Sequence, residues 1–243
     1  MIKLIVLELR RNKISTFLIT SLIIAVVVLG FTFLFGYGPQ IEASRGVMPN
    51  DTAFEIFMTW KGCIPLIGTL FLVSFAVMSA IMNAKFTVEE YDGKKAILLF
   101  SYPVKRSRIL FAKCILVFGF TSLAMFICNI AMVSFFGLIS NAVGILPETF
   151  TTSEFLYLLK FSVVLSLLAS SVGLVAMRIG FIKKSLSASI VSAIIMVGPC
   201  GSLFSKFPDH SFSMMLIGMV ILLVIGLIVF LELLTKVNKM EAV

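Results

Sequence analysis

Charged residues are scarce in this chain of 243 residues, and several patterns that carry enzyme chemistry are missing. Only 13% of the residues are charged, whereas soluble domains keep about a quarter. Hydrophobic residues make up 60% of the chain. The single histidine, His210, and the four cysteines show no metal-ligand spacing, so we expect no metal site. The composition predicts an integral membrane protein of the all-α class.

Two sources of transport energy are also missing from the sequence. No Gly-x-x-x-x-Gly-Lys-[Ser/Thr] loop occurs, and Asp92-Gly93-Lys94-Lys95 lacks a glycine-rich lead-in. We therefore expect that this chain binds no nucleotide cofactor and is not itself an ATPase or another enzyme. No ionisable residue lies in the middle of a long apolar run, which argues against a proton- or sodium-driven pump.

Six apolar runs are long enough to cross a hydrocarbon core of about 30 Å. We predict that they form one transmembrane domain over residues 1–243. Gly36-Tyr37-Gly38-Pro39 is expected to end the first run, and Gly198-Pro199-Cys200-Gly201 to interrupt the fifth. Trp60 and Lys61 are expected to mark a membrane interface before the second run. The predicted spans are 14–35, 63–84, 114–139, 155–177, 186–204 and 214–234.

The basic residues predict the orientation. If both termini lie inside, all but four of the 20 lysines and arginines fall on inner segments. The positive-inside rule then gives an N-in, C-in protein of the cell membrane. This distribution accounts for the net charge of +8, so we expect no nucleic-acid partner. The four outer basic residues are Arg45, Lys61, Lys160 and Lys206.

The first 13 residues predict a helix lying on the membrane surface. At helical spacing an apolar face opposes a charged face, although two leucines fall on the charged side. The alternative is a plain charged flank before the first span. The apolar face comprises Ile2, Ile5, Val6 and Leu9, and the charged face comprises Lys3, Glu8, Arg10 and Arg11.

Three serines repeat at i, i+4 and i+8 on the fourth run, and a glycine follows them. Small residues at this spacing typically permit close helix packing. The alternative is a polar lining for a substrate path. These residues are Ser162, Ser166, Ser170 and Gly173.

The longest polar interruption, residues 86–113, separates the second and third runs. It holds three carboxylates, a short apolar patch, a proline and a basic cluster, and such a segment cannot lie in hydrocarbon. Thr87 with Glu90 fits a capping box, which predicts a short helix. We interpret the segment as a surface for a cytoplasmic partner; the alternative is a solvated turn. Its predicted contact residues are Glu89, Glu90, Asp92, Gly93, Leu98, Leu99, Pro103 and Arg106.

This topology and loop resemble the ABC-2 type permease family. The family's loop commonly shows an acidic residue, a glycine, a leucine-rich step, a proline, a basic residue and a lysine entering the third span. A small residue or threonine often follows the glycine, where this chain has Lys94. The matching residues are Glu89 or Glu90, Gly93, Leu98-Leu99, Pro103, Arg106 and Lys113.

The resemblance implies a coupling helix that docks on separate cytoplasmic ATPase subunits, which would carry the ATP and Mg²⁺. It also implies that the N-terminal helix is the family's interfacial helix, and that the break between the fifth and sixth spans is a shortened outer re-entrant element. A second permease copy or a paralogue would complete the translocation path, with the first and fifth spans facing the seam.

The resemblance also implies the expected function, that of an ATP-driven exporter for an amphipathic substrate such as an antimicrobial or cytolytic peptide. Export of a lipid or glycan is the alternative. An intramembrane enzyme is a third reading, suggested by Glu89-Glu90. It is disfavoured because such chemistry needs carboxylates and histidines within the membrane, and His210 is predicted on the opposite face.

Overall fold

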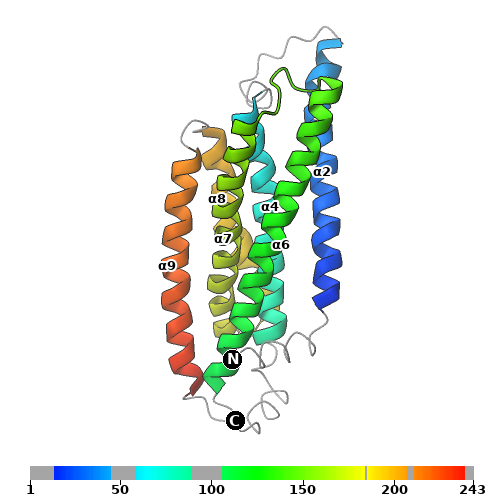
Figure 1. Ribbon diagram of the computed structural model, residues 1–243. Helices are drawn as coiled ribbons and strands as arrows, with labels where there is room; N and C mark the ends of the chain where they lie inside the picture. Colours follow the sequence, from blue (N-terminus) through cyan, green and yellow to red (C-terminus); the bar gives the residue numbers. More distant parts are fainter. Residues whose placement is uncertain (1–13, 45–58, 89–105, 184, 207–210, 239–243) are drawn as a thin grey trace.

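The computed structural model describes residues 14–44, 59–88, 106–183, 185–206 and 211–238, and helices are the only regular elements in these ranges (Figure 1). This confirms the predicted all-α class. The elements are α2 (Ile14–Ser44), α4 (Trp60–Asn83), the π-helical turn η1 (Ala84–Val88), α6 (Arg106–Val143), α7 (Thr152–Lys183), α8 (Leu186–Lys206) and α9 (Ser211–Asn238).

Five of the six predicted spans each fall within one helix, and the second span, 63–84, covers α4 and the first residue of η1. The helices extend beyond most of the predicted boundaries. Among the described residues, five helices are long and apolar enough to cross a membrane: α2, α4 with η1, α6, α7 and α9. The apolar part of α8 is shorter, Leu186–Pro199. That α8 crosses the membrane stays a prediction. The count of six spans and the orientation stay predictions with it.

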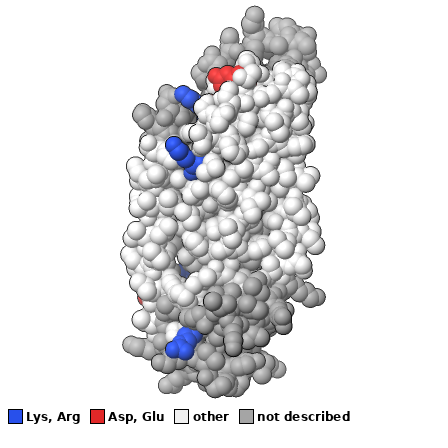
Figure 2. Space-filling model, viewed as in Figure 1, with Lys and Arg blue, Asp and Glu red and all other residues white. Residues whose placement is uncertain are grey.

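The bundle is built around α4 and α7, which contact each other and both contact α6 and α8. About two-thirds of the residues in the apolar windows of α4 and α7 are buried. The helices α2 and α9 lie at opposite edges (Figure 1), and only 11% of the apolar window of α9 is buried. Figure 2 shows that charged side chains are sparse between the two ends of the bundle on the face in view. Such a surface suits lipid contact.

Two predicted helix breaks are absent from the structure. The helix α2 continues through Gly36 and Pro39 to Ser44, and α8 continues through Pro199 to Lys206. Membrane helices tolerate glycine and proline because an interrupted turn can be re-satisfied locally. Gly36 instead provides close packing, since a Cβ atom there would lie 3.1 Å from the Phe136 ring.

The C-terminus of α6 turns sharply back toward α7. Gly144 adopts φ +74°, a left-handed conformation that favours glycine, and its N–H donates to the Ser140 carbonyl at 2.8 Å. The Ser140 hydroxyl accepts a further bond from the Leu146 N–H. This turn brings Glu148 back over the bundle. The helix that contains the fourth predicted span, 155–177, begins three residues before that span, at Thr152.

The indole of Trp60 is fully buried rather than facing lipid, which corrects its predicted role as an interface residue. Its Nε1–H donates to the Glu148 carbonyl at 3.0 Å. Its backbone N–H donates to Glu148 Oε2 at 3.0 Å, so a remote carboxylate caps the start of α4. The rings of Phe136 and Phe150 pack edge-on against the indole.

Glu148→Ala should lower the free energy of unfolding by about 1 kcal/mol, because it removes the carboxylate that caps α4. The indole bond to the backbone carbonyl would remain. Equilibrium unfolding in mixed micelles measures the change. Glu154→Ala, in the first turn of α7, is the matched control. Equal effects of the two substitutions would contradict a capping role specific to Glu148.

Candidate functional site at the base of the predicted coupling loop

The predicted coupling loop leaves and re-enters the bundle at a single end. Its first flank, η1, ends at Val88, and its second flank, α6, begins at Arg106. Both flanks lie at the end opposite Trp60, where α2 also begins and α9 ends (Figure 1). We call this end of the bundle the loop base.

Most residues predicted to form functional surfaces lie outside the described residues. Arg106 is the exception, as the first residue of α6. The others in the coupling loop are Glu89, Glu90, Asp92, Gly93, Leu98, Leu99 and Pro103. The predicted interfacial residues outside the described ranges are Ile2, Ile5, Leu9, Arg10 and Arg11.

The first flank of the loop is a π-helical turn. Four of its five residues are buried, and Lys85 is exposed. Isolated π-turns within helices are frequent at functional sites. Thr87 lies inside this turn and is fully buried, so it does not cap a new helix. The predicted capping box with Glu90 is therefore wrong at Thr87.

A buried lysine joins the two flanks. Lys113 lies two turns into α6, its side chain is only 1% exposed, and its Nζ donates to the Phe86 carbonyl of η1 at 2.7 Å. An ammonium group out of water is costly unless it is hydrogen-bonded, so this contact fixes where α6 sits against η1. The sequence predicted only a lysine entering the third span. The signal for burial was its position on an otherwise apolar helical stretch.

A seam of polar side chains runs from the loop base into the bundle along η1 and α4. Ser79, Asn83 and Thr87 follow at i, i+4 and i+8, and all three are at most 1% exposed. Among the described residues, Ser79 Oγ, Asn83 Oδ1 and Thr87 Oγ1 have no hydrogen-bond partner. Buried polar atoms without partners usually mark water, strain or a functional site.

The facing surface of α7 meets this seam at a glycine. A Cβ atom built on Gly173 would lie 1.9 Å from Ser79 Oγ and 2.7 Å from Ser79 Cβ. Only glycine permits this approach of α4 and α7. The seam is thus a tightly fitted helix contact with unsatisfied oxygens beside it.

The serine repeat of α7 is buried in helix contacts. The Asn129 side-chain amide on α6 donates to Ser162 Oγ at 2.9 Å. Ser170 Oγ donates to the Ser166 carbonyl at 3.0 Å, within α7. All three serines are at most 4% exposed. These contacts favour the packing interpretation of the repeat over a polar substrate lining.

Basic side chains are concentrated at the loop base. Lys85, Arg108 and Lys183 are exposed there. Arg178 on α7 forms an ion pair with Glu232 on α9, and their side chains are 16% and 53% exposed. The exposed charge suits an aqueous face and a partner bearing acidic groups.

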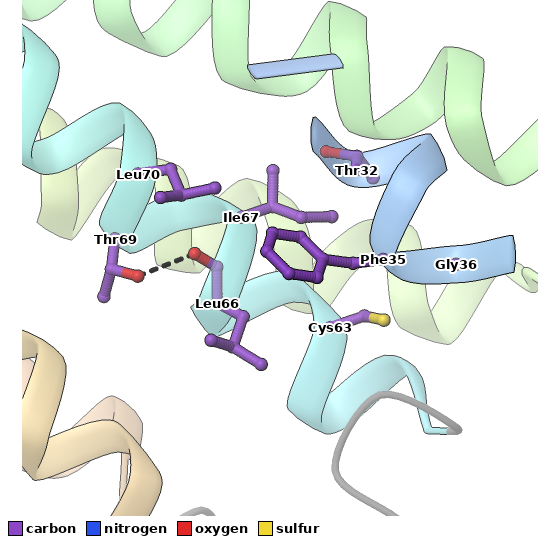
Figure 3. A pocket seen from close by; sticks show the side chains of 8 residues that line it. All are labelled: Thr32, Phe35, Gly36, Cys63, Leu66, Ile67, Thr69 and Leu70. Carbon is purple, nitrogen blue, oxygen red and sulfur yellow. Dashed lines mark hydrogen bonds between the residues drawn. The ribbon is translucent and has the colours of Figure 1, made fainter. Parts of the chain in front are cut away.

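A small apolar pocket lies between α2 and α4, near the end that carries Trp60 (Figure 3). Its volume is about 150 Å³, and the ring of Phe35 points toward Ile67 across it. The Thr69 hydroxyl faces its own helix, donating to the Leu66 carbonyl at 2.6 Å. The lining contains no charged residue, so we assign this pocket no ligand.

Comparison with known proteins gives one family and one relative. Residues 2–201 match the model of a family described as ABC-2 family transporter protein. A Bacillus subtilis (strain 168) protein named "Uncharacterized protein YcbO" is 26% identical over 194 residues, covering 80% of this chain and 81% of that protein. No solved structure matches the chain.

Proposed function

Because this chain belongs to the ABC-2 transporter family, we propose that it is the permease subunit of an ATP-driven exporter, coupled to its ATPase through the loop base. Membership makes the chain a multi-pass cell-membrane component of a transporter, with hydrolysis in a cytoplasmic ABC ATPase. The Lys113 contact to the Phe86 carbonyl carries the coupling proposal. It ties together both helices that flank the loop, so a push on the loop moves α4 and α6 as a unit.

The loop base faces the cytoplasm in this proposal, as the basic residues predict. The polar seam beside Gly173 is then the element that responds to the ATPase. Its unsatisfied oxygens make the observed contact between α4 and α7 less favourable than a fully paired one. A second arrangement of these helices can therefore lie close in free energy, as conformational switching requires.

The working assembly is two permease chains, identical or paralogous, with two ATPase subunits. Large apolar side chains are exposed on α2 and on α8, the helices expected at the seam between copies. The cargo is an amphipathic molecule such as an antimicrobial or cytolytic peptide, or else a lipid or glycan.

The test is the double substitution Glu89→Ala with Glu90→Ala. These carboxylates are proposed to make charge-assisted contacts with the ATPase, which are strong when desolvated. The tagged wild-type chain should co-purify with an ABC ATPase from native membranes. We expect the double variant to insert normally but to lose ATPase recovery, or to lose substrate-stimulated hydrolysis while basal hydrolysis remains.

The matched control is Glu42→Ala with Asp51→Ala, which removes two carboxylates from the predicted outer segment. This control should keep both ATPase recovery and transport. Full ATPase binding and full transport by the Glu89/Glu90 variant would show that these carboxylates have no coupling role. Failure of the wild-type chain to recover any ATPase would contradict the partner assignment itself.

A further inference from the structure

A second cavity lies on the lateral surface at the loop-base half of the bundle, between α6, α7 and α9. We call it the lateral groove. Its volume is about 310 Å³, at the lower end of the range for ligand sites. It is lined by Phe111, Cys114, Ile115, Phe118, Gly119, Ser171, Leu174, Leu223, Leu227 and Phe230.

The lateral groove opens toward the lipid-facing surface. Ile115 on one wall is 43% exposed and Leu227 on the other is 49% exposed. The rings of Phe111 and Phe230 meet with centroids 5.7 Å apart and join α6 to α9 toward the loop base. From Phe111 to Gly119 the groove follows α6 for about 12 Å, close to the roughly 15 Å thickness of one leaflet's hydrocarbon.

Two arginine side chains lie one helical turn beyond the residues that line the lateral groove, toward the loop base. Arg108 precedes Phe111 by three residues and is exposed. Arg178 follows Leu174 by four residues. Since residues three and four apart share a helix face, both arginines lie on the faces that line the groove. Glu232 pairs with Arg178, so the three groups together carry one net positive charge.

We propose that the lateral groove binds one anionic phospholipid, with an acyl chain in the groove and the phosphate at Arg108. Within the described residues, no ion pair or hydrogen bond engages the Arg108 guanidinium. A guanidinium matches phosphate geometry with two parallel donors, and basic residues at this depth attract anionic headgroups. The lateral groove is about as long as one leaflet is thick, and an exposed arginine lies beyond its end. Its shape and charge are therefore complementary to such a lipid. The inference does not depend on the proposed transport function.

A glycine in the lining makes the groove testable. No atom lies within 4 Å of a Cβ atom built on Gly119, so a leucine side chain there would enter the open groove. Gly30 on α2 offers equally open space outside the groove, and Gly30→Leu is the matched control. Arg108→Gln removes the proposed phosphate contact, and Lys183→Gln controls for loss of an exposed charge at the same end.

Native mass spectrometry of the full chain, titrated with dioleoyl-phosphatidylglycerol or dioleoyl-phosphatidylcholine, tests the proposal. We expect one phosphatidylglycerol per chain, bound about tenfold tighter than phosphatidylcholine, the preference typical of a charged hydrogen bond. Gly119→Leu should weaken both lipids at least tenfold while Gly30→Leu does not. Arg108→Gln should abolish the preference for phosphatidylglycerol, whereas Lys183→Gln keeps it.

Three results would overturn the assignment. Tight phosphatidylglycerol binding by Gly119→Leu would place the lipid elsewhere. Equal binding of the two lipids to the wild-type chain would remove the role of Arg108. Conversion of a wild-type dimer to a monomer by Gly119→Leu, without loss of lipid, would make a second copy the occupant of the groove. Thermal unfolding of each variant confirms that the comparisons are made on folded protein.

Discussion

Lys113→Glu should be the most damaging single charge change in the described part of the chain, lowering the free energy of unfolding by about 3–5 kcal/mol. The ammonium of Lys113 is buried and donates to the Phe86 carbonyl. A glutamate would set a carboxylate against that carbonyl, so two acceptors would face each other out of water. Equilibrium unfolding in mixed micelles, with recovery of monodisperse protein, measures the loss.

Two further substitutions separate the buried contact from charge in general. Lys183→Glu makes the same charge change at an exposed position of the loop base and should alter stability by less than about 1 kcal/mol. Lys113→Met keeps the length of the side chain and removes the tether. We expect it to fold, because it leaves a neutral carbonyl without a donor rather than an unpaired buried charge, but to couple hydrolysis to transport poorly. A stable Lys113→Glu variant would contradict the buried position of Lys113.

Gly173→Ala should destabilise the protein by about 1–3 kcal/mol, the usual consequence of overpacking a tight contact. The added methyl would overlap the Ser79 side chain, which would have to move or force α4 and α7 apart. Because the same contact borders the polar seam, we also expect transport to fall more than ATPase recovery does. Unfolding in mixed micelles and transport in proteoliposomes are the measurements.

Ser79→Gly should rescue Gly173→Ala, since it removes both atoms that the new methyl meets most closely. The double variant should regain most of the lost stability, which gives a coupling energy of opposite sign to the single losses. Gly119→Ala is the control, because its Cβ atom would meet open space. Additive losses in the double variant would show that Ser79 and Gly173 are not in contact.

The helical framework was predictable because uninterrupted apolar runs leave few alternatives. Each expected span lies within an observed helix, except that the second span ends at Ala84, the first residue of η1. The expected breaks at Gly36–Pro39 and at Pro199 are absent because glycine and proline end membrane helices less often than helices of soluble proteins. In soluble proteins, glycine and proline end a helix partly because water can hydrogen-bond to the backbone N–H and C=O groups that the break releases.

The site was less predictable because its key contacts join distant segments. The burial of Lys113 depends on α6 starting at Arg106, earlier than the predicted span, and on a π-turn in another helix. The burial of Trp60 depends on Glu148, which lies 88 residues away. No spacing within either segment encodes these partners. The predicted coupling residues Glu89 to Pro103 lie outside the described residues, and their role stays a prediction.

The unequal burial of the helices bears on how the protein is made. The exposed faces of α2 and α9 are strongly apolar, so these two helices can leave the insertion machinery for lipid without a partner. In contrast, α7 carries buried serines and a glycine that fit only against neighbours. It is synthesised after α4 and α6, so its polar face emerges when the surfaces that receive it are already in the membrane. Chain order therefore allows the polar face of α7 to pack against α4 and α6 as soon as α7 enters the membrane.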